Sequence, residues 1–211
     1  MIDIKRRSAL IVVDMQNDFL PGGALPVKDG GKIIYGINEL AREFYNKDRI
    51  VVFSQDWHPK FHASFASSHE GKNPGDPIEG VSGIGPILWP DHCVQNTHGA
   101  EINERIKKEY GIAVIRKGDN PAIDSYSAFF ENDKKTKTGL TDLLRSKRIV
   151  TVYVVGLALD YCCFYTAMDA KSEGFDVIFI QNLTKGIDIP ENNIKNSLDS
   201  MKSAGINIID F

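Results

Sequence analysis

Six short apolar runs, rich in valine and isoleucine, recur along the whole chain. They do not alternate with polar residues, which is typical of strands buried on both faces of a parallel sheet. The segments between them carry apolar residues at helical spacing. This pattern predicts an α/β fold: a three-layer α/β/α sandwich of Rossmann-like topology, with a mostly parallel central sheet of about six strands. The runs are 9–13, 50–53, 112–115, 149–155, 177–180 and 206–209.

The composition excludes several classes of partner. The net charge of −3 gives no electrostatic basis for binding nucleic acid or an anionic membrane surface. No stretch approaches the ~20 apolar residues of a membrane span, and no signal-peptide pattern precedes the first strand. Three cysteines, two of them adjacent, make no disulfide framework, so we expect a cytoplasmic protein.

One long region breaks the strand–helix rhythm. The length suits a single domain, which we expect to cover residues 1–211. Between residues 56 and 99, however, glycine, proline and histidine are frequent and periodicity is weak. A loop of this length in a compact domain is usually functional. We therefore expect a loop insertion near 56–99 that carries a metal site.

Chemically active side chains follow the ends of four predicted strands: Asp14, Asp56, Lys117 and, on the turn after the fourth strand, Cys162. Parallel strands place their carboxyl ends on one edge of the sheet, so these groups should meet there. On a strand-to-helix turn, outward N–H groups and the helix dipole favour the thiolate, which is the nucleophilic form. The set predicts a cysteine hydrolase, although Cys162 and Cys163 taken alone fit buried core thiols equally well.

A metal site is predicted from the loop insertion. Asp56 and His58 are two residues apart on an extended segment, so both side chains project from one side and can share an ion. His92 could complete the set, and His62 is either a fourth ligand or a group that supports a ligand from behind. Two histidines and one aspartate suit one divalent ion, with Zn²⁺ preferred over Fe²⁺ or Mn²⁺. The alternative is that a proline-rich loop carries these histidines on its surface.

Five motifs, spread over nearly the full chain, combine these residues. They occupy 13–19, 55–59, 89–94, 117–129 and 156–162. Together they resemble the nicotinamidase family of the isochorismatase-like cysteine hydrolases. The superfamily at large shares the aspartate, lysine and cysteine that match Asp14, Lys117 and Cys162. The metal-site residues Asp56, His58 and His92 resemble those of the nicotinamidase branch.

The resemblance implies an isochorismatase-like fold and a metal-dependent amidohydrolase that converts nicotinamide and water to nicotinate and ammonia, in NAD salvage. The reaction would pass through a thioester on Cys162, and pyrazinamide would be a second substrate. It also implies a cis peptide between Leu157 and Ala158, which would direct the N–H of Ala158 at the oxyanion. The implied roles are Asp14, Lys117 and Cys162 as the triad, Asp56, His58 and His92 as metal ligands, and Phe19, Trp89 and Tyr126 around the pyridine ring.

Three other interpretations stay open at this point. One is another amidase of the same superfamily, acting on a ureido or carbamoyl substrate. A second is a non-catalytic domain that binds metal or senses redox state through Cys162 and Cys163, although adjacent cysteines rarely form an unstrained disulfide. The third is an NAD-binding oxidoreductase, for which no glycine fingerprint follows a strand. The oligomeric state is also open, since the sequence fits a monomer or a homo-oligomer.

Overall fold

A computed structural model of the chain describes residues 2–79 and 83–211. Within these residues, six strands form one sheet in the order β3-β2-β1-β4-β5-β6, and every neighbouring pair is parallel. This arrangement confirms the predicted α/β fold class. The strands are β1 (Ser8–Val13), β2 (Ile50–Asp56), β3 (Ala113–Lys117), β4 (Thr151–Leu157), β5 (Asp176–Lys185) and β6 (Asn207–Ile209).

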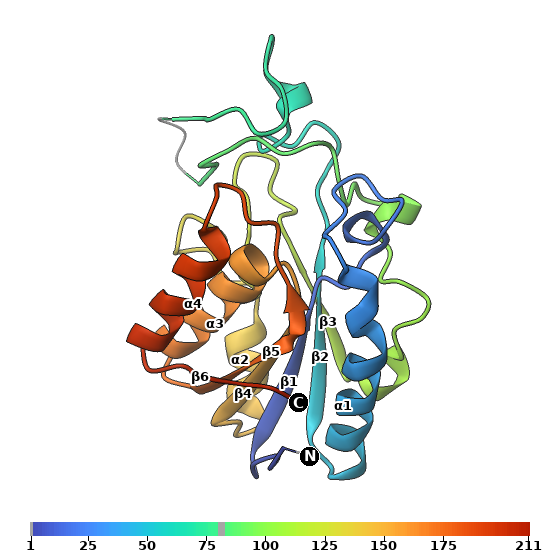
Figure 1. The fold of residues 1–211 in the computed structure, drawn as a ribbon, viewed down its shortest axis with the longest axis vertical. Coiled ribbons are helices and arrows are strands. Elements are labelled where there is room, and N and C mark those ends of the chain that lie inside the picture. Colours follow the sequence, from blue (N-terminus) through green and yellow to red (C-terminus); the bar gives the residue numbers. More distant parts are fainter. Residues whose placement is uncertain (1, 80–82) are drawn as a thin grey trace.

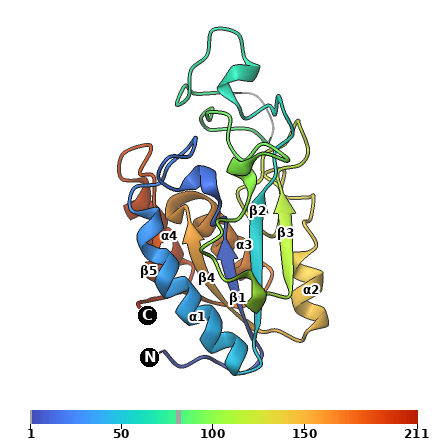
Figure 2. The same cartoon turned by 90° about the vertical axis from the view of Figure 1, so that its right-hand side faces the viewer.

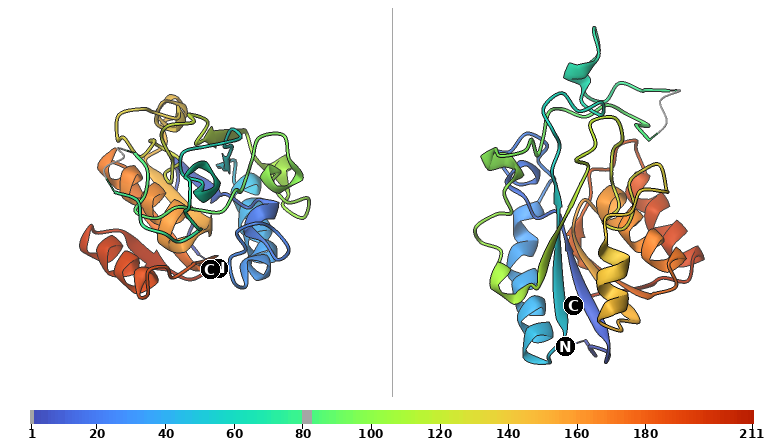
Figure 3. Two further views of the ribbon diagram at one scale, coloured as in Figure 1. Left: turned by 90° about the horizontal axis from the view of Figure 1, so that it is seen from above. Right: turned by 180° about the vertical axis from the view of Figure 1, so that it is seen from behind.

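Helices cover both faces of the sheet, which gives the three predicted layers (Figure 1, Figure 3). One face is covered by α1, and the opposite face by α2, α3 and α4. Alternate residues of β1 divide between the two cores: Leu10 and Val12 pack with α1, whereas Ile11 packs on the other side. The helices are α1 (Ile34–Asn46), α2 (Leu140–Ser146), α3 (Phe164–Ser172) and α4 (Asn193–Ser203).

The expectation of strands buried on both faces is wrong for two of the six runs. The runs 112–115 and 206–209 form β3 and β6, which lie at the two edges of the sheet. These edge strands are less covered than the central ones: Val114 of β3 and Ile112, the residue before it, are exposed although their residue types match those of the central strands. Apolar composition alone therefore did not distinguish an edge strand from a central one.

Long loops lie above the carboxyl ends of the strands. The predicted insertion near 56–99 supplies the part that projects furthest from the sheet (Figure 2), except that residues 80–82 lie outside the described part of the chain. A second irregular segment joins β3 to α2 at the same end. In the ranges that the structure describes, no helix is both long and apolar enough to cross a lipid bilayer.

Candidate active site

Strand register places the first functional groups side by side. Asp56, the last residue of β2, is the register partner of Lys117, the last residue of β3. On the other side of β2 lies β1, whose last residue, Val13, is the partner of Gly156 on β4. A Cβ at Gly156 would lie 2.1 Å from the Val13 carbonyl oxygen, so this close approach of β1 and β4 requires glycine. The predicted strand ends therefore converge on one edge of the sheet.

Lys117 is the centre of the site. Its fully buried ammonium lies 2.9 Å from Asp14 Oδ2 and 3.5 Å from Cys162 Sγ, donates a hydrogen bond to Asp56 Oδ1, and donates another to the Ser125 carbonyl at 2.8 Å. Burial alone would lower the pKa of Lys117, but the two carboxylates outweigh it and hold the pKa well above its usual value. The side chain therefore stays charged between the two acids.

Asp14 is buried immediately after β1. Ser54 Oγ donates to its Oδ1 at 2.6 Å, whereas Oδ2 pairs with Lys117 by charge and accepts no hydrogen bond from any residue in the described ranges. Burial raises the pKa of Asp14, partly opposed by Lys117. One carboxylate oxygen of Asp14, one of Asp56 and the Cys162 sulfur all lie within 4.8 Å of one another. Asp14 is thus placed to accept a proton from the thiol.

Cys162 lies in the single π-helical turn Leu159–Cys163, which leads directly into α3. The peptide bond between Leu157 and Ala158 is cis, as the resemblance implies. The structure differs from the expectation that this turn favours a thiolate: burial, together with nearby Asp14 and against Lys117, raises the pKa of Cys162 well above its usual value. The resting thiol therefore needs a base to remove its proton.

Cys163 has no place in this site. It is fully buried in the hydrophobic core that α2, α3 and α4 form against the sheet. Burial raises the pKa of its thiol well above the usual value. A packing role accounts for this second cysteine, whereas the sulfur of its neighbour Cys162 lies 3.5 Å from the Lys117 ammonium.

The three predicted metal ligands form one cluster. Their nearest donor atoms, His58 Nε2 and His92 Nε2, lie 3.8 and 3.9 Å from Asp56 Oδ2. Each histidine uses its other ring nitrogen on a backbone carbonyl, since His58 Nδ1 is 2.9 Å from Gly118 O and His92 Nδ1 is 2.8 Å from Pro90 O. These carbonyls can only accept, so Nδ1 carries the proton and Nε2 offers its lone pair to an ion.

Electrostatics agree with this donor set. Burial lowers the pKa of His92, and the neighbouring His58 lowers it further. Burial also lowers the pKa of His58 well below its usual value, and there the neighbouring His62 adds to the effect. Both rings are therefore neutral, which is the form that binds a metal. A carboxylate and two neutral imidazoles, all buried, fit one divalent ion with an open position.

His62 and Asp124 extend the cluster. His62 is buried against His58, with ring centroids 4.4 Å apart, and its Nδ1 lies 2.7 Å from Ser64 Oγ. Asp124 Oδ1 lies 4.0 Å from His58 Nε2, and His58, His62 and Asp124 form a second group whose ligand atoms are all within 4.8 Å. The sequence interpretation included Asp124 in a motif but gave it no role. The only feature of the sequence that could have pointed to Asp124 as a site residue was its position seven residues after Lys117, in an aperiodic loop.

A narrow pocket connects the thiol to the metal cluster. Its free volume of about 20 Å³ is that of roughly one water, so a larger ligand enters only as the side chains of its walls move apart. The sequence interpretation gave no role to four of the side chains that line it: Leu25, Asp124, Tyr161 and Ile187. The pocket also contains the residues predicted around the ring and at the oxyanion, together with parts of the other clusters: Phe19, Trp89, Tyr126, Ala158, Cys162, Asp56 and His92.

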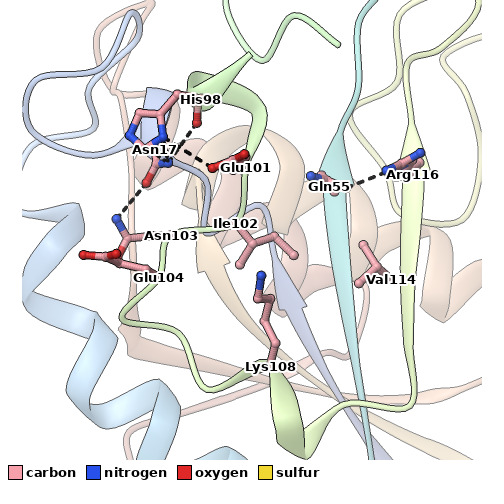
Figure 4. Close-up of a pocket in the computed structure, with 10 residues that line it drawn as sticks. All are labelled: Asn17, Gln55, His98, Glu101, Ile102, Asn103, Glu104, Lys108, Val114 and Arg116. Atoms are coloured by element: carbon pink, nitrogen blue, oxygen red, sulfur yellow. Dashed lines mark hydrogen bonds and ion pairs between the residues drawn. The ribbon is translucent and has the colours of Figure 1, made fainter. Parts of the chain in front are cut away.

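A larger hollow of about 840 Å³ lies elsewhere, beside β2 and β3 (Figure 4). Its polar side chains mostly bond to one another: Asn17 and Glu101 contact His98, and Arg116 donates to Gln55 at 3.3 Å. No cysteine lines it, and none of the residues predicted for catalysis or metal binding does. The small pocket at Cys162 is therefore the better candidate for chemistry.

Comparison with known proteins agrees with this geometry. Residues 8–211 match the model of the isochorismatase domain. The chain belongs to the isochorismatase family. Within the family, it is 45% identical over 199 residues to the nicotinamidase of Acinetobacter baylyi, covering 94% of this chain and 90% of that one.

Two solved structures of the family extend the comparison. The nicotinamidase/pyrazinamidase of Acinetobacter baumannii superposes with a TM-score of 0.93 at 44% identity, covering 99% of this chain and 98% of the other. The pyrazinamidase of Pyrococcus horikoshii in complex with zinc has a TM-score of 0.77 at 38% identity, covering 97% and 99%. These relatives cover almost the whole chain, including the loops above the sheet.

Proposed function

We propose that this protein is a nicotinamidase, which hydrolyses nicotinamide to nicotinate and ammonia, and that it also cleaves pyrazinamide. The observation that carries the proposal is the convergence of a thiol, a buried carboxylate and a buried ammonium beside one pocket, which Cys162 lines together with two of the three residues of the metal-ligand cluster, Asp56 and His92. The similarity to nicotinamidases over nearly the full chain supports it. The reaction places the protein in NAD salvage, and three free thiols fit a reducing compartment such as the cytoplasm.

The first half of the reaction forms a thioester. Asp14 takes the proton of Cys162, and the resulting thiolate attacks the carboxamide carbon. The N–H groups of Ala158 and Cys162 stabilise the oxyanion, for which one lost donor typically costs ~10²–10³ in rate. Asp14 then returns its proton to the leaving nitrogen, the C–N bond breaks, and ammonia departs.

The second half regenerates the enzyme. Asp14, again ionised, accepts a proton from water as the water oxygen attacks the thioester carbon. The C–S bond breaks, the proton held by Asp14 returns to the sulfur of Cys162, and the acid product leaves as nicotinate after losing its carboxyl proton to solvent. Throughout both halves, Lys117 keeps Asp14 paired and stabilises negative charge that develops on the sulfur, from which its Nζ is 3.5 Å away.

Asp56, His58 and His92 would hold one divalent ion, for which we propose Zn²⁺, with Fe²⁺ or Mn²⁺ as alternatives. When bound, the ion supplies a Lewis-acidic partner for the pyridine nitrogen and so orients the ring. The aromatic side chains do the rest of the recognition, because Phe19 and Trp89 offer apolar surface to a flat heterocycle.

Ammonia release by the purified protein tests the proposal. We expect nicotinamide and pyrazinamide to yield ammonia, activity to fall after treatment with a chelator, and Zn²⁺ to restore it. Cys162→Ala is the control, and it should fold but release no ammonia. If the wild-type protein released ammonia from a ureido or carbamoyl substrate and none from nicotinamide, another amidase of the same superfamily would replace this proposal.

A further inference from the structure

Asp160 is a buried acid that the reaction above does not use. It lies two residues before Cys162, in the same turn, and is 2% exposed. No cation pairs with it among the described residues; its two oxygens instead accept three N–H groups from one loop. Ile187 N donates to Oδ1 at 2.9 Å, whereas Asp188 N at 2.8 Å and Asn193 Nδ2 at 3.1 Å donate to Oδ2.

The segment held in this way, the loop 186–192 with Asn193 at the start of α4, contributes to the wall of the pocket. Ile187 lines the pocket together with aromatic side chains that come from other segments of the chain. The next residue, Asp188, has a positive φ of 59° and accepts a hydrogen bond from Ile194 N at the start of α4. Tyr161, which also lines the pocket, donates its hydroxyl proton to the Ile189 carbonyl. The wall is therefore attached to the turn that carries the nucleophile.

We propose that Asp160 is a positioning residue that fixes the Ile187 wall relative to Cys162 and thereby sets the affinity of the pocket for the substrate ring. The inference rests on the proposed function for its kinetic part and deepens it by adding a specificity-determining wall. Asp160 touches neither the reacting sulfur nor the substrate, and acts through the loop. Its three acceptor bonds join two segments that are about 27 residues apart in sequence.

The variant Asp160→Asn separates this role from general packing. It keeps the size and shape of the side chain but replaces one acceptor oxygen with a donor. Oδ1 and Oδ2 both accept backbone N–H groups, so either orientation of the amide places an NH₂ against a donor from Ile187 or Asp188. The loop must then move away from the turn, because two facing donors lose a hydrogen bond and leave a buried group unsatisfied.

Kinetics provide the first readout. With nicotinamide as substrate, Asp160→Asn should raise KM about tenfold, the scale of one lost apolar contact in a pocket, while kcat stays within about threefold. Ile187→Ala should raise KM similarly. In the Ile187→Ala background, Asp160→Asn should raise KM by less than about a further twofold. The matched control is Asp169→Asn, another buried acid, which pairs with Lys134 away from the pocket and should leave KM unchanged.

Hydrogen exchange provides a second readout that does not depend on turnover. In Asp160→Asn, the amides of Ile187 and Asp188 should exchange at least about tenfold faster, whereas those of β1 should not change. Unchanged exchange at these two amides would overturn the inference whether or not nicotinamide is a substrate. So would a fall in kcat at constant KM, which would place the effect on the nucleophile rather than on the wall.

A milder variant covers the case in which Asp160→Asn does not fold. Asn193→Ala removes the third hydrogen bond to the carboxylate, together with the longer one that the same amide donates to the Asp160 carbonyl at 3.2 Å, and leaves those from Ile187 and Asp188 in place. It should produce the same pattern at smaller size, with KM about twofold to threefold higher. Wild-type protein that released no ammonia from nicotinamide would refute the proposed function alone, since the exchange measurement still decides the role of Asp160. Fully additive effects of the Asp160 and Ile187 substitutions on KM would refute the coupling.

Discussion

Replacing Glu131 by glutamine should stabilise the protein at alkaline pH and leave its stability unchanged in acid. Glu131 is 5% exposed in the loop between β3 and α2, and its Oε2 accepts no hydrogen bond from any residue of the described ranges. Burial, and next the charges of Asp119, Asp133 and Asp124, raise its pKa from 4.5 to about 7. The folded protein therefore binds this proton more tightly than the unfolded chain does.

The sign and size follow from linkage. Below about pH 4.5, Glu131 is protonated in the folded and the unfolded protein, so its burial does not lower the free energy of unfolding. Between about pH 4.5 and 7 only the folded protein keeps the proton, so the free energy of unfolding falls as pH rises. Above about pH 7 the full cost is present. The shift from 4.5 to about 7 corresponds to up to about 3 kcal/mol, or a rise in Tm of roughly 6–12 °C for Glu131→Gln at pH 8.

Urea unfolding of the wild type and of Glu131→Gln at pH 4.5 and pH 8 measures this difference. The two proteins should have equal free energies of unfolding at the lower pH, and the variant should be more stable at the higher one. Glu104→Gln, which removes an exposed charge from another loop, is the control and should change stability by less than about 0.5 kcal/mol at either pH. A stability difference independent of pH, or a variant less stable at pH 8, would refute the reasoning.

Three further predictions concern the site. Cys162→Ala should abolish ammonia release, whereas Cys163→Val, which replaces one apolar core residue with another, should keep most of it. The reverse result in the same assay would show that Cys163 is the nucleophile. His92→Ala should lower bound metal measured by mass spectrometry at least about tenfold, and an unchanged metal content would exclude it as a ligand. Gly118→Ala should also weaken metal binding, because a Cβ there would lie 2.5 Å from the His58 ring at a φ of +68°; an unchanged dissociation constant for Zn²⁺ would contradict this.

Most of the fold was predictable because local composition and tertiary position agree for it. The central strands β1 and β4 are short, mostly apolar runs rich in valine, and each is buried on both faces. The same composition recurs in β3, where Val114 is exposed, since the number of strand neighbours is a property of the assembled sheet. Which strand forms an edge of the sheet depends on the order of the strands, and no short window of sequence contains that order.

The site was predictable as a set of groups at strand ends, but not in its electrostatics. A turn that leads into a helix favours a thiolate only where the thiol keeps some solvent, and Cys162 is buried beside Asp14. The walls formed by Leu25 and Ile187 were also missed, because they come from irregular loops whose positions depend on long-range hydrogen bonds such as the one that Ile187 N donates to Asp160. Periodicity carries no information about such bonds.

The least predictable feature is that one buried ammonium group, that of Lys117, forms ion pairs with two carboxylates that have different proposed roles. Lys117 pairs with Asp14, the proposed base, and with Asp56, a proposed metal ligand, because the register of β2 and β3 places Asp56 directly beside it. A carboxylate that a buried lysine already neutralises in part attracts a divalent ion less strongly than a free one, whereas the neutral histidines add no charge. The same contact also prevents two buried carboxylates from facing each other unpaired, so the geometry of the metal cluster and the basicity of Asp14 depend on a single side chain.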